Sequence, residues 1–540
     1  MPENIWFLGS TKSLYLECLA VGNPQPSYKW LTGPTDQTID QELDASSENR
    51  YIVTNGKLTI NDPTDSDANY YRCEASNTEG KIISNFAHLS LGRLGEFSNV
   101  ADAPVTAYMF EGSVIQCSKI HYEPTVVYNW ERITGTSQDI ILETIPHIFI
   151  SSNGRLYFSE VQDSDAAVYH CRVSLSGISR NVVGTAQPPS AVSRPIILNV
   201  NIQAAKDDWG PIMQDDFINV FPNPPSRGQD VRLECFAYGT ANNYKNSWKY
   251  IWTREGGLPS KAKFESFNRI LILENAQAED EGRYTCLVTR GSGQASRDYT
   301  LVLQTKPYFL MELQHQHIDI GSQLTWQCLA DGNPAPVYSW YFNGFLISPN
   351  NPNFIVRRNI LIIQSADPVK HNGMFQCGAT NVKGQILSSA QLRVLQFPPS
   401  FAKHPLPSSL SGAIRGNITI PCNPEGSPRP EIKWQRRDAR GSLIDISATV
   451  NQGQIDSTNH YQLSMNGALI IINIATSDAG TYICTATNDQ GEDSSGCELK
   501  VQEGTTLFRT PLPTYDTYYQ NDTIFIQCEA SYDRSEERRV

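Results

Sequence analysis

The stretch "DEGRYTC", Asp280–Cys286, belongs to a motif that the chain repeats. An acidic residue, a small residue, an aromatic residue and a cysteine recur in it at every second position. The related stretches are "DANYYRC" (Asp67–Cys73), "DAAVYHC" (Asp165–Cys171), "HNGMFQC" (His371–Cys377) and "DAGTYIC" (Asp478–Cys484). A repeat of this kind in a chain of 540 residues, which is too long for one hydrophobic core, predicts five or six related domains.

Each motif ends in a cysteine that has a possible partner upstream. The separation ranges from 49 residues (328 to 377) to 62 residues (422 to 484). The predicted disulfides are Cys18–Cys73, Cys117–Cys171, Cys235–Cys286, Cys328–Cys377 and Cys422–Cys484. One disulfide per domain indicates an oxidising compartment. No cysteine pair or Cys/His spacing fits a zinc site, so we expect no metal.

A tryptophan follows the first cysteine of each pair, usually as Tyr-x-Trp. These core residues are Trp30, Trp130, Trp252, Trp340 and Trp434. In the third repeat Trp248 also qualifies, but Trp252 keeps a tyrosine two positions before it. Cys…Trp…Cys among alternating segments and Asn-Gly turns predicts an all-β chain of tandem immunoglobulin-like sandwiches. The short cysteine separations favour the intermediate (I-set) type.

The repeated motif itself is best explained as a turn. The tyrosine two residues before the closing cysteine predicts a tyrosine corner at Tyr71, Tyr169, Tyr284 and Tyr482. The preceding aspartate is expected to accept backbone N–H bonds in the same turn. The fourth repeat has His371 and Phe375 at these two positions, so we expect its corner to lack both anchors and to be weaker.

The net charge and the absence of catalytic motifs from the sequence argue against nucleic-acid binding and against catalysis. A net charge of −13 argues against a nucleic-acid partner. The chain contains no Ser-His-Asp arrangement, phosphate-binding loop or H-E-x-x-H motif, so neither an enzyme nor a small-molecule substrate nor a cofactor is expected. Asn417 and Asn521 lie in glycosylation sequons, which suit a secreted chain. The sequence shows no signal peptide and no stretch long enough to span a membrane, which indicates a fragment.

Two cysteines have no partner in a complete repeat. Cys497 shares a strand face with Leu499 and Val501, so we expect a buried free thiol. A bond to Cys528 and a crosslink between two molecules are the alternatives. Cys528 opens a sixth repeat that stops before its partner.

The repeats define the domain boundaries. The last residues, "RSEERRV", are typical of a translated sequencing adapter and are left out of the fold. We expect immunoglobulin-like domains 1 to 5 at residues 1–94, 97–200, 223–305, 306–396 and 397–503, a linker at 201–222, the start of a sixth domain at 504–533, and the adapter-derived segment at 534–540.

The junction between the second and third domains is unusual. At four junctions the closing cysteine of one domain and the opening cysteine of the next are nearly equally spaced, by 44 (73 to 117), 42 (286 to 328), 45 (377 to 422) and 44 residues (484 to 528). Between the second and third domains the spacing is 64 residues (171 to 235). About twenty additional extended residues reach roughly 60 Å, enough to turn the chain back along a sandwich. We therefore expect the first domain to meet the fourth and the second to meet the third. The stretch contains apolar residues such as Trp209, which argues against a bare linker, although no clear single strand is evident in it.

The sequence also resembles the contactins. The stretches that carry the resemblance are "EGSVIQCSKIHYEPTVVYNWER" (Glu111–Arg132), "DVRLECFAYG" (Asp230–Gly239), "DIGSQLTWQCLADGNPAPVYSWYFNG" (Asp319–Gly344) and "IFIQCEASYD" (Ile524–Asp533), in the order of the contactin domains. The divergent loops are similar to those of invertebrate contactins.

That resemblance implies a horseshoe of the first four domains and a cell-adhesion function. It also implies neural or axonal recognition, septate-type junctions, and neurexin-like and neuroglian-like cell-surface partners. The location implied is the outer face of the plasma membrane, with fibronectin repeats and a glycolipid anchor in the remainder of the protein. Two alternatives stay open: a hemolin-like secreted immune protein, and the ectodomain of a receptor kinase or phosphatase.

Overall fold

The computed structural model describes residues 3–36, 38–44, 50–135, 137–140, 145–203, 209–214, 220–239, 248–437, 441–446 and 460–502. They fall into two compact units. The first comprises Met1–His315, Thr325–Leu361 and Gly373–Gln391, and the second comprises Gln316–Leu324, Ile362–Asn372 and Leu392–Val540. No helix in the described ranges is long and apolar enough to cross a membrane. Cys528, Asn521, the expected start of a sixth domain and residues 534–540 lie outside the described residues.

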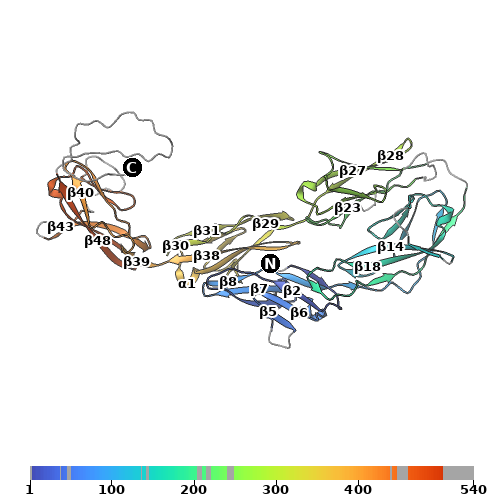
Figure 1. The fold of residues 1–540 in the computed structure, drawn as a ribbon, viewed down its shortest axis with the longest axis horizontal. Coiled ribbons are helices and arrows are strands. Elements are labelled where there is room, and N and C mark those ends of the chain that lie inside the picture. The colour runs from blue at the N-terminus through green and yellow to red at the C-terminus, as the bar shows by residue number, and fades with distance from the viewer. Residues whose placement is uncertain are drawn as a thin grey trace, which may run out of the picture. The chain divides into compact units, whose positions relative to one another are not determined.

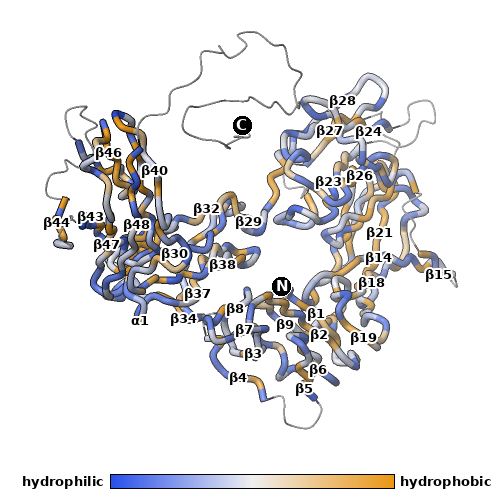
Figure 2. Tube along the Cα trace, turned by 60° about the vertical axis from the view of Figure 1, so that its left-hand side comes forward, coloured by the Kyte–Doolittle hydropathy of each residue, from blue (hydrophilic) through white to orange (hydrophobic). Residues whose placement is uncertain are grey.

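The described chain forms five β-sandwiches, which confirms the predicted fold class (Figure 1). Hydrophobic residues are concentrated along the strands, as the orange segments in Figure 2 show. In domain 1, one sheet has the order β1-β9-β7-β3-β4 with β8 beside β7, and the other contains β2, β6 and β5. The strands of domain 1 are β1 (Ile5–Phe7), β2 (Ser13–Glu17), β3 (Ser27–Gly33), β4 (Gln41–Glu42), β5 (Tyr51–Thr54), β6 (Lys57–Asn61), β7 (Tyr70–Asn77), β8 (Gly80–Ile83) and β9 (Ala87–Leu91).

Domain 2 repeats this plan with sheets β11-β21-β18-β14-β15 and β12-β17-β16. Part of the long junction is the last strand of this sandwich, because β21 pairs in parallel with β11. The expectation that the junction holds no clear strand is therefore wrong for its first half. The strands are β10 (Arg93–Leu94), β11 (Val105–Tyr108), β12 (Ser113–Gln116), β13 (Tyr122–Glu123), β14 (Thr125–Thr134), β15 (Ser137–Ile140), β16 (Ile148–Ile150), β17 (Arg155–Phe158), β18 (Ala167–Ser176), β19 (Val182–Val183), β20 (Ser190–Val192) and β21 (Ile196–Asn201).

Domain 3 has sheets β22-β23-β26-β25 and β24-β27-β28. The later part of the junction reaches this domain, where Met213 packs against the core and Ile212 forms an antiparallel bridge with Tyr238. The strands are β22 (Val220–Phe221), β23 (Val231–Glu234), β24 (Lys249–Arg254), β25 (Ala262–Glu265), β26 (Ile270–Leu273), β27 (Gly282–Arg290) and β28 (Gly293–Leu301).

Domain 4 has sheets β30-β38-β37-β33-β34 and β31-β36-β35, and domain 5 has β40-β48-β47-β43-β44 and β41-β46-β45. In both, a leading strand pairs with the segment that follows the first cysteine, as β29 with β32 and β39 with β42. The elements of domain 4 are β29 (Thr305–Met311), β30 (Gln316–Asp319), β31 (Leu324–Gln327), β32 (Leu329–Asn333), β33 (Val337–Phe342), β34 (Phe345–Leu346), β35 (Ile355–Arg357), β36 (Ile360–Ile363), α1 (Pro368–His371), β37 (Gly373–Asn381) and β38 (Gly384–Leu395). Those of domain 5 are β39 (Phe397–Ser400), β40 (Ser409–Ala413), β41 (Ile418–Ile420), β42 (Glu425–Ser427), β43 (Glu431–Arg437), β44 (Leu443–Asp445), β45 (Tyr461–Leu463), β46 (Leu469–Ile471), β47 (Gly480–Asn488) and β48 (Gly491–Gln502).

A tryptophan beside a disulfide forms the centre of each sandwich. The bonded pairs are Cys18–Cys73, Cys117–Cys171, Cys235–Cys286, Cys328–Cys377 and Cys422–Cys484. In every domain the second cysteine lies directly opposite the tryptophan on the neighbouring strand. Trp30, Trp130, Trp252, Trp340 and Trp434 are all buried. Trp248 is only partly buried and packs at the edge of the domain 3 core.

The repeated motif forms a turn anchored at two points. The tyrosine hydroxyls donate to aspartate carbonyls four residues earlier, in the bonds Tyr71–Asp67 (3.1 Å), Tyr169–Asp165 (2.8 Å), Tyr284–Asp280 (2.7 Å) and Tyr482–Asp478 (2.9 Å). Each aspartate carboxylate accepts the backbone N–H three residues before it, from Thr64, Gln162, Gln277 and Ala475. The turn carries one helical turn of the 3-10 type at Asp65–Asp67, Asp163–Asp165, Ala278–Asp280 and Thr476–Asp478.

Each of these four aspartates pairs with a basic side chain that the sequence analysis did not predict. The pairs are Arg50–Asp67, His147–Asp165 (3.0 Å), Lys261–Asp280 (2.6 Å) and His460–Asp478 (2.9 Å). The basic residue lies 17 to 19 positions upstream (67 − 50, 280 − 261) and so could have been found by its spacing. Each pair places a basic side chain beside a carboxylate that the fold buries.

The corner of domain 4 is anchored differently from what we expected. His371 occupies the place of the aspartate and is 4% exposed. Its Nδ1 accepts the backbone N–H of Asp367 at 2.9 Å, while the Asp367 carboxylate accepts from Val369 and Lys370 at the start of α1. Phe375 cannot make the tyrosine bond; its ring lies 4.7 Å from Phe342. The expectation that both anchors are lost is therefore wrong for His371, because an imidazole nitrogen replaces the carboxylate as the acceptor.

We predict that His371→Leu destabilises this corner by about 1 kcal/mol, because it leaves the partly buried N–H of Asp367 without its acceptor. Hydrogen exchange of peptides covering 364–376 should become faster. Lys370→Leu is the matched control, since Lys370 is an exposed neighbour in the same turn. Equal exchange in the two variants would contradict the anchoring role.

Candidate interaction platform

Domains of the first unit meet at strands whose residues are buried on both faces of the sheet. Elsewhere buried and exposed residues alternate along a strand. Strand β7 of domain 1 alternates between buried and partly exposed residues. In β37 of domain 4, by contrast, every residue from Phe375 to Ala379 is buried. In β26 of domain 3 all four residues are buried. A strand buried on both faces must be covered by a second layer.

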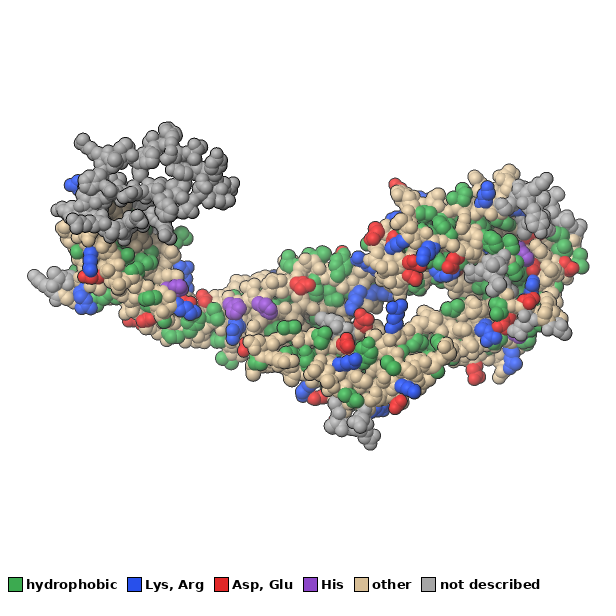
Figure 3. Space-filling view, in the orientation of Figure 1, with side chains coloured by type: hydrophobic (Ala, Val, Ile, Leu, Met, Phe, Trp, Pro, Cys, Tyr) green, Lys and Arg blue, Asp and Glu red, His purple; other side chains and the backbone are tan. Residues whose placement is uncertain are grey.

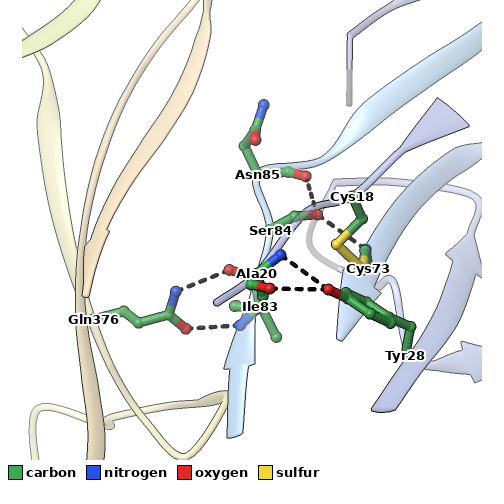
Figure 4. The surroundings of a disulfide bond; sticks show 8 residues. All are labelled: Cys18, Ala20, Tyr28, Cys73, Ile83, Ser84, Asn85 and Gln376. Carbon is green, nitrogen blue, oxygen red and sulfur yellow. Dashed lines mark hydrogen bonds between the residues drawn. A yellow bond between two sulfur atoms is a disulfide. The ribbon is translucent and has the colours of Figure 1, made fainter. Parts of the chain in front are cut away.

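Domain 1 covers the outer face of β37 (Figure 4). Gln376 is 1% exposed. Its side-chain amide makes the same pair of hydrogen bonds to the Ile83 backbone that a neighbouring strand would make. Its Oε1 accepts the Ile83 N–H at 2.8 Å, and its Nε2 donates to the Ile83 carbonyl at 2.8 Å. Ile83 also packs with Tyr341 and Leu387 in a small apolar cluster.

The periphery of this contact is polar. Gln391 Nε2 donates to the Glu79 carboxylate at 2.9 Å. Lys81 pairs with Glu74 at 2.8 Å and lies over the Phe345 ring, 5.4 Å from its centroid. Gly80 is needed here, because a Cβ at its φ of +148° would lie 2.8 Å from Asn343 Oδ1. The edges of the contact therefore add specificity around the apolar centre.

Domains 2 and 3 meet through an aromatic cluster. Phe149 and Tyr157 from domain 2 pack with Phe236 and Tyr238 from domain 3. The Phe149 and Phe236 rings stack with centroids 5.5 Å apart. The junction joins this cluster, since Trp209 packs against it; Trp209 Nε1 also donates to the Phe110 carbonyl at 2.8 Å.

An acidic and a basic side chain are buried in the same contact. Arg269 is 1% exposed and donates to the carbonyls of Ile148 and Pro146. Glu234 is 0% exposed and accepts from Ser151 Oγ at 2.5 Å, and from Ser152 N and Oγ at 2.9 and 2.6 Å. Burial raises the pKa of Glu234, while the bonds from Ser151 and Ser152 and the charge of Arg232 oppose that shift.

A loop of domain 2 is bound to domain 1. Strand β19 pairs with β2, so that Val182 lies opposite Leu14. Ser179 N donates to the Trp6 carbonyl at 3.0 Å, and Trp6 N donates to Ser179 Oγ at 2.9 Å. The loop therefore extends a sheet of domain 1 and is not a free recognition loop.

Two further sequence candidates, Cys497 and Asn417, lie in domain 5. Cys497 is 1% exposed in the core of domain 5, and burial raises the pKa of its thiol. Asn417 is exposed, with its Oδ1 accepting from Asn473 N at 2.9 Å. Acidic and basic side chains are interspersed on the face shown in Figure 3. Among the described residues, no group of three or more His, Cys, Asp or Glu side chains could hold a metal ion.

Comparison with known proteins identifies the family. The profile described as "Immunoglobulin domain" matches residues 2–77, 217–289, 306–381 and 398–488. The chain therefore belongs to the immunoglobulin-domain family. Domain 2 falls outside the matched ranges but has the same disulfide, tryptophan and tyrosine corner.

Within that family the chain is similar to contactins. It is 34% identical over 528 residues to Contactin of Drosophila melanogaster, covering 96% of this chain and 35% of the relative. It is 30% identical over 538 residues to Contactin-5 of Rattus norvegicus, covering 99% of this chain and 45% of the relative. The chain thus spans less than half of these relatives. The solved structure of Sidekick-1 immunoglobulin domains 1-5 shares the fold, with a TM-score of 0.55 and 23% identity over 93% of this chain and 97% of that one.

We predict that Gln376→Ala opens the contact between domains 1 and 4. It removes both partners of the Ile83 backbone, and each buried group left unsatisfied costs about 1–3 kcal/mol. The radius of gyration from small-angle scattering should rise. Thr285→Ala is the control, because Thr285 occupies the same position before the closing cysteine of domain 3 and is only partly buried. An unchanged radius in Gln376→Ala would contradict the prediction.

A second prediction concerns the pH dependence of the domain 2–3 contact. Because the pKa of Glu234 is raised, the folded contact binds a proton more tightly than the unfolded chain does. Stability should therefore fall as pH rises from the ordinary carboxyl value of 4.5 through the raised value.

The measurement is hydrogen exchange at Ser151–Phe158 across that pH range. Glu234→Gln should flatten the dependence while keeping an acceptor for Ser151. Glu274→Gln is the control, since Glu274 is an exposed carboxylate of domain 3 that pairs with Lys263. If Glu234→Gln and the unmodified chain show the same slope, the pH dependence has another source.

Proposed function

We propose that the chain is the adhesive, non-enzymatic part of a contactin-type cell-surface protein. The observation that carries the proposal is similarity to contactins over 96–99% of the chain, through all five sandwiches. The structure adds a physical argument. The contacts from domain 1 to domain 4 and from domain 2 to domain 3 leave other sheet faces available for a partner protein, which suits binding through surfaces and not through pockets.

The finer assignment rests on the same similarity. We infer an extracellular location at cell junctions, with a glycolipid anchor in the complete protein. The proposed partners are other cell-surface proteins, namely a neurexin-like contactin-associated protein and a neuroglian-like immunoglobulin adhesion protein. Neural or axonal recognition and septate-type junctions are the settings in which we place this binding. A hemolin-like protein or a receptor ectodomain is less favoured, because the similarity to the Drosophila and rat contactins extends over nearly the whole chain.

A bead-adhesion assay tests this proposal. Beads coated with the chain are added to cells that display either proposed partner ectodomain, and to cells that display neither. We expect retention only on the displaying cells. Soluble chain in excess should abolish retention, because it occupies the same partner surface.

The folded-back arrangement can be tested in the same assay. Gln376→Ala should weaken retention if the partner contacts a face that domains 1 and 4 build together, and Thr285→Ala should not. Equal retention of both variants with intact partner binding would place the partner on a single domain. Absence of retention on both displaying cell lines would refute the proposed partners.

A further inference from the structure

Domain 5 lacks a tyrosine that the other four domains share. Two residues before the core tryptophan, domains 1 to 4 have Tyr28, Tyr128, Tyr250 and Tyr338, and domain 5 has Ile432. All four tyrosines are buried or partly buried. An isoleucine in their place has no hydroxyl and does not reach as far as a phenol ring. The place of the outer ring atoms must therefore be either refilled or left open in domain 5.

In domains 1 and 4 the tyrosine hydroxyl bonds to the backbone two residues after the first disulfide cysteine. The Tyr28 hydroxyl accepts from the Ala20 N–H and donates to the Ala20 carbonyl, both at 3.1 Å (Figure 4). Tyr338 makes the same pair of bonds with Ala330, at 2.9 and 3.0 Å. Domain 5 has Pro424 at this position, and a proline keeps the carbonyl but has no N–H. A tyrosine hydroxyl can therefore still donate there, but it can no longer accept.

The tyrosine ring also lies against the glycine of an Asn-Gly turn. In domain 1 a Cβ on Gly56 would lie 3.1 Å from the Tyr28 ring. Domain 5 keeps this glycine as Gly467, where a Cβ would lie 3.0 Å from Ile432 Cγ1. The glycine thus faces the same side-chain position in both domains.

A pocket of about 630 Å³ lies where the ring is missing. It is lined by Ile432, Pro424 and Gly467. These residues correspond to the tyrosine itself, to the backbone that its hydroxyl binds and to the glycine that its ring contacts. The volume is within the range of small-ligand sites, roughly 300–1,000 Å³. The space that the other domains fill with their own tyrosine is therefore open to a side chain from outside.

The rim of the pocket suits an aromatic ring. Met465 lines it and is 94% exposed, and a methionine thioether packs favourably against the edge of a ring. Arg429 also lines it, with its guanidinium donating to the Met465 carbonyl at 3.4 Å. A guanidinium cation is electrostatically complementary to the electron-rich face of an aromatic ring. A ring that enters between Ile432 and the rim therefore meets an apolar floor and a cation.

We propose that domain 5 binds a tyrosine side chain of a partner protein in this pocket. The ring packs on Ile432 and Gly467, and its hydroxyl donates to the Pro424 carbonyl, as the Tyr28 hydroxyl donates to Ala20. A protein is the source because tyrosine is enriched among the anchor side chains that fill pockets at the centre of protein interfaces. This site goes beyond the proposed function, which assigns no residue of domain 5, and it adds a side-chain anchor to the contacts of the sheet faces.

Methyl NMR of the full chain, with labelled methionine and isoleucine methyl groups, tests this inference. The probe is the peptide acetyl-Gly-Gly-Tyr-Gly-Gly-amide. Because the chain has only six methionines, the Met465 signal can be assigned by its loss in Met465→Ala. We expect saturable shifts at Met465 and Ile432, and none at Met374, which lies in the first unit.

The same titration measures which side chain the pocket prefers. A peptide with Phe in place of Tyr should bind more weakly by roughly threefold or more, because it cannot donate to the Pro424 carbonyl. A peptide with Leu should bind more weakly by roughly tenfold or more, because it also loses the ring contact with Arg429.

Two variants with matched controls locate the binding. Ile432→Tyr should abolish the Met465 shift, because it fills the pocket with the ring of the chain itself. Ile251→Tyr is its control, since Ile251 is 43% exposed on the equivalent strand of domain 3. Arg429→Gln should weaken binding by roughly two- to fivefold. Arg437→Gln, a change of an exposed arginine at the end of β43, should leave binding intact.

Absence of a saturable Met465 shift with the Tyr peptide would overturn the inference. Unchanged binding in both Ile432→Tyr and Arg429→Gln would also overturn it, since the probe would then lie elsewhere. Saturation by N-acetyl-tyrosinamide but not by the peptide would assign the pocket to a free small molecule, and would equally refute a partner protein as the source.

Discussion

The packing of one tryptophan against one disulfide is the constraint on which each sandwich depends. Because the closing cysteine lies directly opposite the tryptophan in all five domains, the register between the two central strands is fixed. With period-two alternation, that register decides which residues of the central strand face inward. The tyrosine two positions before the cysteine must then point into the core, where its hydroxyl can reach the turn.

The same register decides what faces outward. The residue just before the closing cysteine always lies on the outer face, and its chemistry differs among domains. It is the buried Gln376 in domain 4, where the outer face is covered, and the partly exposed Thr285 in domain 3. A fixed inner face thus leaves the outer face free to vary, and the contacts between domains arise from that variation.

The sequence was sufficient for the sandwiches because their signals are local and spaced at fixed intervals. The sheet faces that another domain covers could not be predicted in this way, because no local pattern distinguishes them. The run Ile270–Leu273 in domain 3 and the run Ile360–Ile363 in domain 4 look alike, yet all four residues of the first are buried and only alternate residues of the second. Gln376 likewise reads as an ordinary surface residue. Its burial depends on a partner about 290 residues away in the chain, at Ile83, and only the folded structure brings them together.

The bonds to Ile83 and the small apolar cluster around it contribute only a modest free energy to the contact between domains 1 and 4. Two amide bonds contribute about 1 kcal/mol each, and the Ile83 cluster adds a few more. A total near 4 kcal/mol corresponds to a dissociation constant of about 1 mM between separate domains. If the chain between domains 1 and 4 were a flexible tether, it would give each domain an effective concentration of about 1 mM near the other. That equals the dissociation constant, so the contact would form only part of the time. The buried bonds of Arg269 and Glu234 and the stacked rings between domains 2 and 3 hold the tether in one orientation, which raises that concentration. The meeting of domains 1 and 4 therefore depends more on Arg269, Glu234 and the aromatic cluster than on its own bonds.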